Sequence, residues 1–301
     1  MVIERALEKM RQQSGIAAKA ETPARPAADS GRRTESDRRS PARAGATGAH
    51  PTLSKPVFPA IAIDPRAAEI NRILLPQAQG GDATYAGSAA YRMLRTRLLQ
   101  RLRSNDWKTL AITSPGAAEG KSLTALNLAI NLARDKSVDV FLLDLDMRNP
   151  SLCNYLGARP THELVRYFAG EGAPADSLFS IGIENLTLAG STIPTEQASE
   201  LAASTRLEEM IAYIGGIAPN PVILLDLPPL LVTDEALLVA PRVDATVLVV
   251  AEGRTRRDSL ARARQLLADF SFAGVILNRS SESYGVDNYY GYGYRYTGSK
   301  A

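Results

Sequence analysis

Six short apolar segments that alternate with helical stretches constrain the fold of this 301-residue chain more than any other feature. Continuous apolar strands separated by amphipathic helices are typical of a parallel sheet covered on both faces. Right-handed crossovers place the C-terminal ends of such strands along one edge, where ligands bind. The predicted strands are 109–113, 138–143, 186–189, 222–225, 245–251 and 274–277. Helices are expected at about 84–103, 121–134, 196–214, 234–240 and 256–269.

The first predicted strand leads into a loop of small residues, Ser114-Pro-Gly-Ala-Ala-Glu-Gly-Lys-Ser122, followed by a helix. This order is the layout of a phosphate-binding loop, in which Lys121 reaches the β and γ phosphates and Ser122 binds Mg²⁺. The strict pattern fails at its first glycine, which is Pro115, so a helix-starting turn without a ligand is the alternative. The predicted nucleotide-binding residues are Gly116, Ala117, Ala118, Glu119, Gly120, Lys121, Ser122 and Leu123.

Carboxylates follow two later strands. The second predicted strand leads into Asp144-Leu-Asp146, and alternation places both aspartates on one face, at the edge where phosphates would lie. Two carboxylates beside a triphosphate predict Mg²⁺, with one holding the metal and the other orienting or deprotonating a hydroxyl. Capping of the following segment is the alternative. Asp226 closes the fourth strand as a Walker B-type Mg²⁺ ligand, whereas Asp234 is expected to cap a helix.

Charge and composition exclude several classes of protein. Residues 1–60 contain 11 Lys and Arg against 6 Asp and Glu, and the remainder is slightly acidic, so the net charge of +3 does not indicate a nucleic-acid-binding core. The single cysteine, Cys153, excludes an intrachain disulfide, and His50 and His162 are too few for the usual zinc sites. No apolar run reaches the roughly 18 residues of a membrane span and no secretion signal is visible, so a cytoplasmic location is expected.

The two ends of the chain differ in composition from its middle. Residues 1–13 show an amphipathic pattern that predicts a short helix, either docked on a partner surface or frayed. Residues 14–80 are basic and rich in Ala, Pro and Arg, which predicts a disordered linker. Its arginines either contact anionic lipid or polymer or only solvate the chain. A folded domain is expected over 81–280, and a flexible tail over 281–301.

Six of the 11 tyrosines lie in this tail. Glycines separate them and no apolar periodicity suggests burial, so their hydroxyls are candidate phosphate acceptors in a neighbour's site. A sticky or stacking low-complexity segment is the alternative. Each phosphate adds a charge of about −1.5 to −2 and would loosen subunit contacts. The candidate acceptors are Tyr284, Tyr289, Tyr290, Tyr292, Tyr294 and Tyr296.

Taken in order, these motifs resemble those of the bacterial tyrosine kinases, in particular the autokinases of capsule and exopolysaccharide synthesis. The Walker A, A′ and B motifs read TSPGAAEGKS, FLLDLDMRNP and VILLDLPP. The segment around Gly190, Pro194, Glu200 and Leu201, the strand ending at Asn278 and the tyrosine-rich tail also match, so the resemblance covers about 85–301. The N-terminal Ile-Glu-Arg-Ala-Leu is similar to a subgroup encoded with exosortase-linked polysaccharide loci.

The resemblance implies an α/β P-loop NTPase fold of Min and Par type, with a mainly parallel sheet and helices on both faces. It implies an ATP- and Mg²⁺-dependent tyrosine autokinase that phosphorylates its own tail and regulates polysaccharide polymerisation and export. A membrane polysaccharide co-polymerase would activate it and recruit it to the inner face of the plasma membrane, and a phosphotyrosine phosphatase would reverse the reaction. Lys121, Asp144 and Asp146 match catalytic positions, Ser122, Asp144 and Asp226 match metal ligands, and Asn278 matches an adenine contact.

Two departures from the family pattern keep other functions open. Ala117-Ala118 stand where the family has Pro-Gly, which affects loop geometry. The ring-forming helix keeps Arg92 and Arg95 for oligomerisation, but Ala89 replaces its glutamate. A Min- or Par-type partition ATPase is one alternative, although that class has a second signature lysine at the position of Gly116 and no tyrosine tail. A nucleotide-binding adaptor without catalysis is the other.

Overall fold

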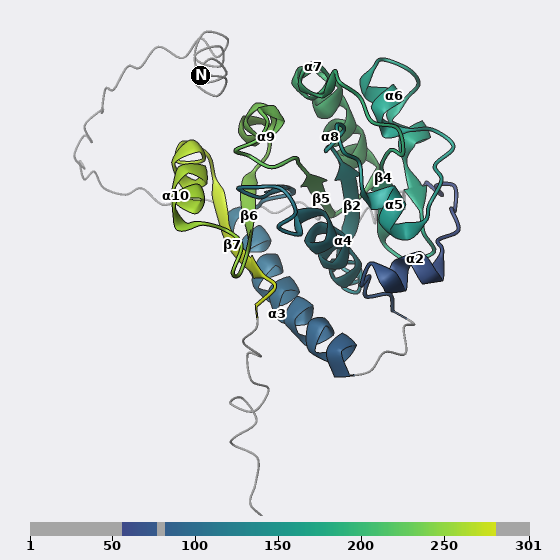
Figure 1. Ribbon diagram of the computed structural model, residues 1–301. Helices are drawn as coiled ribbons and strands as arrows, with labels where there is room; N and C mark the ends of the chain where they lie inside the picture. The colour runs from purple at the N-terminus through teal and green to yellow at the C-terminus, as the bar shows by residue number, and fades with distance from the viewer. Residues whose placement is uncertain (1–55, 77–81, 281–301) are drawn as a thin grey trace, which may run out of the picture. The chain divides into compact units, whose positions relative to one another are not determined.

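A seven-stranded sheet forms the centre of the protein in a computed structural model that describes residues 56–76 and 82–280 (Figure 1). The strand order is β3-β4-β2-β5-β1-β6-β7, and all neighbours are parallel except β3 and β4. The strands are β1 Thr109–Thr113, β2 Asp139–Asp144, β3 Phe179–Ser180, β4 Leu186–Ala189, β5 Pro221–Asp226, β6 Ala245–Ala251 and β7 Phe272–Asn278.

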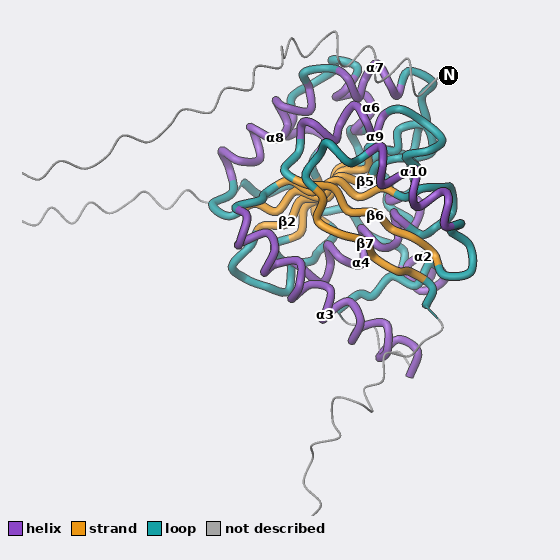
Figure 2. Tube along the Cα trace, turned by 90° about the vertical axis from the view of Figure 1, so that its left-hand side faces the viewer, coloured by secondary structure: helices purple, strands orange, loops and turns teal. Residues whose placement is uncertain are grey.

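Helices cover both faces of this sheet (Figure 2). The chain moves from β1 to β2 in one direction across the sheet and from β5 to β6 and β7 in the other, so right-handed crossovers send the connecting helices to opposite faces. The helices are α2 Pro65–Ile70, α3 Asp82–Asn105, α4 Lys121–Leu132, α5 Leu152–Leu156, α6 Leu164–Phe168, α7 Ala198–Ala203, α8 Arg206–Ile217, α9 Glu235–Val239 and α10 Arg257–Leu266, with short 3₁₀ turns at Pro174–Ser177 and Ala240–Arg242.

The burial of the strands follows their apolar sequences. All residues of β1, β2, β5 and β6 are buried, as continuous apolar runs in the middle of a doubly covered sheet require. The edge strand β7 instead leaves Val275 and Leu277 about half exposed. The predicted fold class is confirmed, and each predicted strand lies within two residues of an observed one. The strand β3 and the five-residue helices α5 and α6 were not predicted, because such short elements carry no periodicity.

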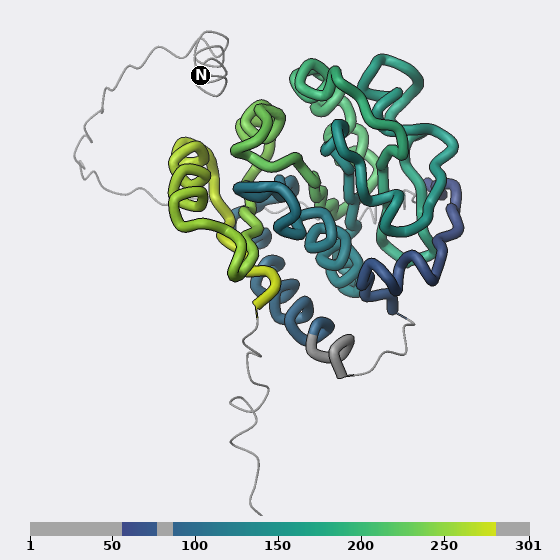
Figure 3. Tube along the Cα trace, viewed as in Figure 1, coloured from purple at the N-terminus to yellow at the C-terminus, as the bar shows by residue number. Residues whose placement is uncertain are grey.

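Residues 56–76 correct the predicted linker over 14–80. They pack on the domain beside α5 and β3 (Figure 3). Asp64 accepts a hydrogen bond from the backbone N–H of Arg66 at the start of α2, and Ala68 and Ile73 are buried. The few apolar residues of this segment make separate contacts with the domain and form no periodic pattern, so the sequence did not predict their packing.

The other predictions on the chain ends lie outside the described residues: the helix over 1–13, the linker up to residue 55 and the tail over 281–301. Within the described ranges, no helix has the length and apolar character needed to cross a membrane.

Candidate nucleotide site

The predicted phosphate loop connects the buried end of β1 to the first turn of α4. Gly120 has a φ of 89°, in the left-handed region, and α4 begins at the next residue, Lys121. The loop is anchored at its base because the Thr113 hydroxyl donates to the Pro228 carbonyl at 2.7 Å. The backbone N–H of Leu230 donates to the Ser114 carbonyl at 2.8 Å. The loop after β5 therefore fixes the strand end from which the phosphate loop starts.

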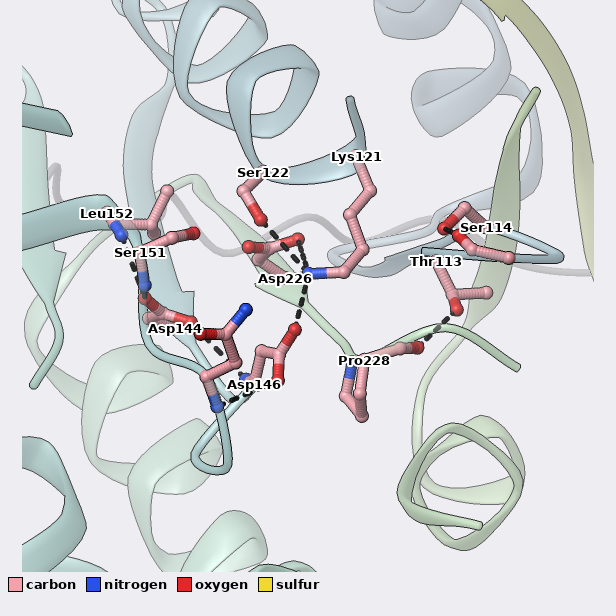
Figure 4. A network of polar contacts seen from close by, with 12 residues as sticks. Thr113, Ser114, Lys121, Ser122, Asp144, Asp146, Ser151, Leu152, Asp226 and Pro228 are labelled. Carbon is pink, nitrogen blue, oxygen red and sulfur yellow. Dashed lines mark hydrogen bonds and ion pairs between the residues drawn. The ribbon is translucent and has the colours of Figure 1, made fainter. Parts of the chain in front are cut away.

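Lys121 is the centre of a buried ion-pair cluster (Figure 4). Its Nζ lies 2.7 Å from Asp146 Oδ2 and 3.6 Å from Asp226 Oδ1, and it donates to the Ser122 hydroxyl at 3.0 Å. Burial lowers the pKa of Lys121, but the charges of Asp226 and Asp146 outweigh burial and the net pKa is raised. The lysine is thus fully cationic and held by carboxylates where a phosphate would otherwise be its partner.

Asp226 is a buried carboxylate that lacks hydrogen-bond donors. It lies opposite Asp144 in the β2–β5 register, and within the described part of the chain neither of its oxygens accepts a hydrogen bond. Burial raises its pKa, and the nearby charge of Lys121 acts in the opposite direction. Lys121, 3.6 Å away, is its nearest cation, and a fully buried carboxylate with so few partners is costly to keep ionised unless a metal ion or a ligand completes its coordination.

Asp144 has a different role from Asp146 in this structure. Its Oδ2 accepts the backbone N–H groups of Ser151 at 2.9 Å and Leu152 at 3.0 Å, where α5 begins. The capping alternative therefore describes Asp144 here, while Asp146 turns toward Lys121. Burial, followed by the charge of Asp226, raises the pKa of Asp144 to about 7.

The raised pKa of Asp144 gives a pH-dependent stability. Because the folded value of about 7 exceeds the unfolded value of about 4, its favourable contribution is complete below pH 4 and is lost as pH rises to 7. We expect Asp144→Asn to gain free energy of unfolding relative to the wild type as pH rises from 5 to 7.5, by at most about 1.4 kcal/mol per pH unit. Urea unfolding of the nucleotide-free chain in EDTA measures this difference. Parallel pH curves for the two proteins would contradict the assignment.

The outer side of the phosphate loop is braced by residues that follow β6 and by residues at the end of β7. The Thr255 hydroxyl donates to Glu119 Oε1 at 2.8 Å, and Asn278 Nδ2 donates to the Glu119 carbonyl at 2.9 Å. Arg279 Nη2 donates to the Ala118 carbonyl at 2.9 Å. The structure therefore places Asn278 behind the loop and against Gly120. A Cβ added to Gly120 would lie 2.1 Å from Asn278 Nδ2. The part played by Thr255 was missed, since a single threonine after a strand carries no sequence signal.

The alanine substitution in the loop leaves a strained residue. Ala118 is exposed and has a φ of 57°, a conformation that costs an L-residue about 1–2 kcal/mol. We expect Ala118→Gly to raise the free energy of unfolding by about 0.5–1 kcal/mol, once the greater freedom of glycine in the unfolded chain is included. The control is Ala117→Gly, whose neighbouring exposed position has no positive φ and should be unchanged or less stable. Urea unfolding of both variants measures the two changes in the free energy of unfolding. Equal changes would contradict backbone strain at Ala118.

A second polar cluster supports the segment after Asp146. Arg148 Nε donates to Glu235 Oε1 at 2.6 Å, and the Ser199 hydroxyl donates to Asp234 at 2.7 Å. The interaction with Glu235 raises the pKa of Arg148. Asp234 stands at the N-cap position of α9, but its side chain makes no capping hydrogen bond, so its predicted capping role is wrong. Glu235 is fully buried and was not predicted as a functional residue.

The residues present fit a bound Mg-nucleotide. Within the described ranges, no three His, Cys, Asp or Glu side chains are grouped as a metal site by themselves. A site built from the Ser122 hydroxyl, the orphaned Asp226 and phosphate oxygens needs no such group, and Asp144 is the further predicted ligand. Gly116, Ala117 and Leu123 lie in the same loop and helix start. Bound Mg²⁺ would neutralise phosphate charge.

The predicted oligomerisation residues lie on α3, on the face of the sheet that α4 also covers (Figure 2). Arg95 Nη1 donates to the Asn131 carbonyl of α4 at 3.4 Å, and Arg92 is exposed and also engaged in an interaction. Arg95 thus contributes to packing within its own chain.

The fold and the site together define a P-loop nucleotide-binding protein, with a lysine at the start of α4 and three aspartates on two neighbouring strand ends. No family model matches the chain. It is 30% identical over 209 residues to tyrosine-protein kinase CpsD of Streptococcus agalactiae, which covers 68% of this chain and 89% of that protein. It is 29% identical over 223 residues to tyrosine-protein kinase wzc of Salmonella typhi, covering 71% of this chain but 30% of that relative.

The solved structure of the BceF tyrosine kinase domain has the same fold, with a TM-score of 0.60 at 24% identity over 75% of this chain and 93% of that domain. The chain belongs to the bacterial tyrosine kinase family, and its enzyme class is that of the protein-tyrosine kinases. The resemblance in sequence motifs is thereby confirmed.

Proposed function

We propose that this chain is an Mg-ATP-dependent autokinase that phosphorylates the tyrosines of its own tail, residues 281–301. The observation that carries the proposal is the placement of Lys121 and Ser122 at the start of α4, facing Asp146 and the orphaned Asp226. When ATP binds, its phosphates would replace the carboxylates as the ion-pair partners of Lys121. Asp226 would then be left for the Mg²⁺ that accompanies the nucleotide.

A tyrosine hydroxyl of the tail would attack the γ phosphorus in line, forming an O–P bond as the bond to ADP breaks. The phenolic proton would go to Asp146 or Asp144. Asp146 is the better placed of the two, because it faces Lys121, whereas Asp144 accepts two backbone N–H groups of α5. Asn278 would act from behind the loop, through Glu119, and its adenine contact remains a prediction.

The biological role that fits this activity is regulation of exopolysaccharide or capsule polymerisation and export. We propose a membrane co-polymerase as activator, which would recruit the chain from the cytoplasm to the inner face of the membrane. The relative wzc supports this proposal, because the part of it that matches this chain is 30% of a longer protein. Homo-oligomerisation through α3 and reversal by a phosphotyrosine phosphatase complete the proposal.

The test is to incubate the purified full-length chain with ATP and Mg²⁺ and to probe for phosphotyrosine. A variant with all six tail tyrosines changed to Phe should lose the signal while keeping ATP binding. In the control variant, Tyr155 and Tyr213, two tyrosines of the folded domain, are changed to Phe. ATP hydrolysis without phosphotyrosine would favour a partition ATPase, and neither activity would favour an adaptor; both outcomes overturn the proposal.

A further inference from the structure

An exposed basic surface lies beside the phosphate loop, on α10 and the turn before it. We call it the α10 arginine surface. Two acidic residues, Glu252 and Asp258, accompany its five arginines, so the surface has a clear excess of positive charge. Its exposed arginines are Arg254, Arg256, Arg257, Arg262 and Arg264.

The five arginines differ in their interactions with the rest of the described domain. Arg256 lies 4.0 Å from Asp258, and the guanidinium of Arg264 stacks 3.8 Å from the centre of the Phe272 ring. Arg254, Arg257 and Arg262 form no ion pair with any residue in the described ranges. Exposed, unpaired guanidinium groups are suited to bidentate recognition of phosphate.

Apolar side chains lie next to the arginines. In the β6–β7 register Thr246 pairs with Phe272, Leu248 with Val275, and Val250 with Leu277. A register shift between Thr246 and Val247 leaves Ala273 as an extra residue in β7. The partners of alternate β6 residues therefore share one face of β7, the face on which Arg264 covers Phe272. Val275 is 46% exposed and Leu277 is 52% exposed, so this face offers uncovered apolar area beside the cations.

The surface is close to both the site and the start of the tail. Thr255, between Arg254 and Arg256, donates to Glu119 of the phosphate loop. The chain leaves β7 at Arg279, which donates to the Ala118 carbonyl. Residues 281–301 contain two acidic and two basic side chains, so only phosphorylation gives this segment a strong negative charge, of about −1.5 to −2 for each phosphate.

We propose that the α10 arginine surface binds the phosphorylated tail, residues 281–301, of the same chain. Phosphates would pair with Arg254, Arg257 and Arg262, and tyrosine rings would lie on Val275 and Leu277. The reach is sufficient, since Tyr284 is the fifth residue after Arg279, about 17 Å away when the chain is extended, and α10 is about 15 Å long. The inference rests on the proposed function, because the side chains of an unmodified tail carry no net negative charge for the surface to recognise.

The test uses a synthetic peptide of residues 281–301 with its tyrosines phosphorylated, titrated by fluorescence anisotropy in about 0.1 M salt. The receptor is the full-length Lys121→Met chain, whose own tail stays unmodified, so binding is measured whether or not the wild type phosphorylates itself. We expect the phosphorylated peptide to bind at least about tenfold tighter than the unphosphorylated one. Equal binding of the two peptides would overturn the proposal.

The surface is tested by adding Arg254→Gln, Arg257→Gln and Arg262→Gln to that receptor, with its unfolding midpoint checked. The matched control changes Arg66, Arg134 and Arg159 to Gln, three exposed arginines on other elements, and so removes the same charge. Peptide affinity should fall at least about tenfold in the first variant only. Equal losses of peptide affinity in both variants would overturn the proposal. The proposal is also overturned if the first variant keeps its peptide affinity but loses binding to phosphatidylserine vesicles, and the surface would then bind a membrane.

Occupation by the chain's own tail has a separate readout. Wild-type chain, phosphorylated with ATP and Mg²⁺ and verified by mass, should bind the added phosphopeptide at least about tenfold more weakly than the Lys121→Met chain, because its tail already covers the surface. Equal affinity would overturn binding within the same chain. Absence of self-phosphorylation would instead count against the proposed function alone.

Discussion

A Lys121→Met variant is expected to form phosphotyrosine at least about a hundredfold more slowly than the wild type, because it loses the one buried cation at the start of α4 that can meet the phosphates. The methionine keeps the length of the side chain but donates no hydrogen bond. Asp146 and Asp226 also lose their cation, so the unfolding midpoint should fall. Initial rates measured with labelled ATP, well below the midpoint of the variant, give the comparison.

The control for this variant is Lys136→Met, which removes a lysine whose side chain is 82% exposed and lies 3.8 Å from Glu184. Exposed pairs of this kind contribute about 0–1 kcal/mol, so rate and midpoint should remain those of the wild type. Robust phosphotyrosine formation by Lys121→Met would sink the assigned role of the lysine.

An Asp226→Asn variant is expected to lose activity while the nucleotide-free domain becomes more stable. Its carboxylate is fully buried, and burial raises its pKa even though Lys121 lies 3.6 Å away, so a neutral amide is easier to bury. We expect phosphotyrosine formation to fall about a hundredfold and the unfolding midpoint in EDTA to rise by about 2–4 °C, the shift that about 1 kcal/mol gives a domain of this size.

The comparison for this prediction is Asp146→Asn, in which the partner of Lys121 at 2.7 Å becomes neutral. That change should lower the midpoint, since the cation keeps only the more distant Asp226. A fall of similar size in the unfolding midpoints of both variants would contradict the view that the ionised Asp226 destabilises the nucleotide-free domain. Calorimetry in EDTA and phosphotyrosine assays with Mg²⁺ separate the two effects.

Sequence patterns predicted the fold well because they act over short distances. The apolar runs of β1, β2, β5 and β6 are each buried as a whole, so composition alone marks them. The docking of residues 56–76 was not visible, because it depends on single contacts with distant partners, such as the Asn127 side chain that accepts the N–H of Leu74.

The sequence by itself determined which residues meet at the site. Lys121, Ser122, Asp144, Asp146 and Asp226 end or follow strands of one parallel sheet, and topology brings such ends to one edge.

Only the tertiary structure decided what each of them contacts. It directed Asp144 to the start of α5 and Asp146 to Lys121, left Asp226 with Lys121 only at 3.6 Å, and placed Thr255 behind the loop. The physical reason is that hydrogen bonds and ion pairs depend on ångström distances between groups far apart in the chain, which packing sets and spacing in the sequence does not.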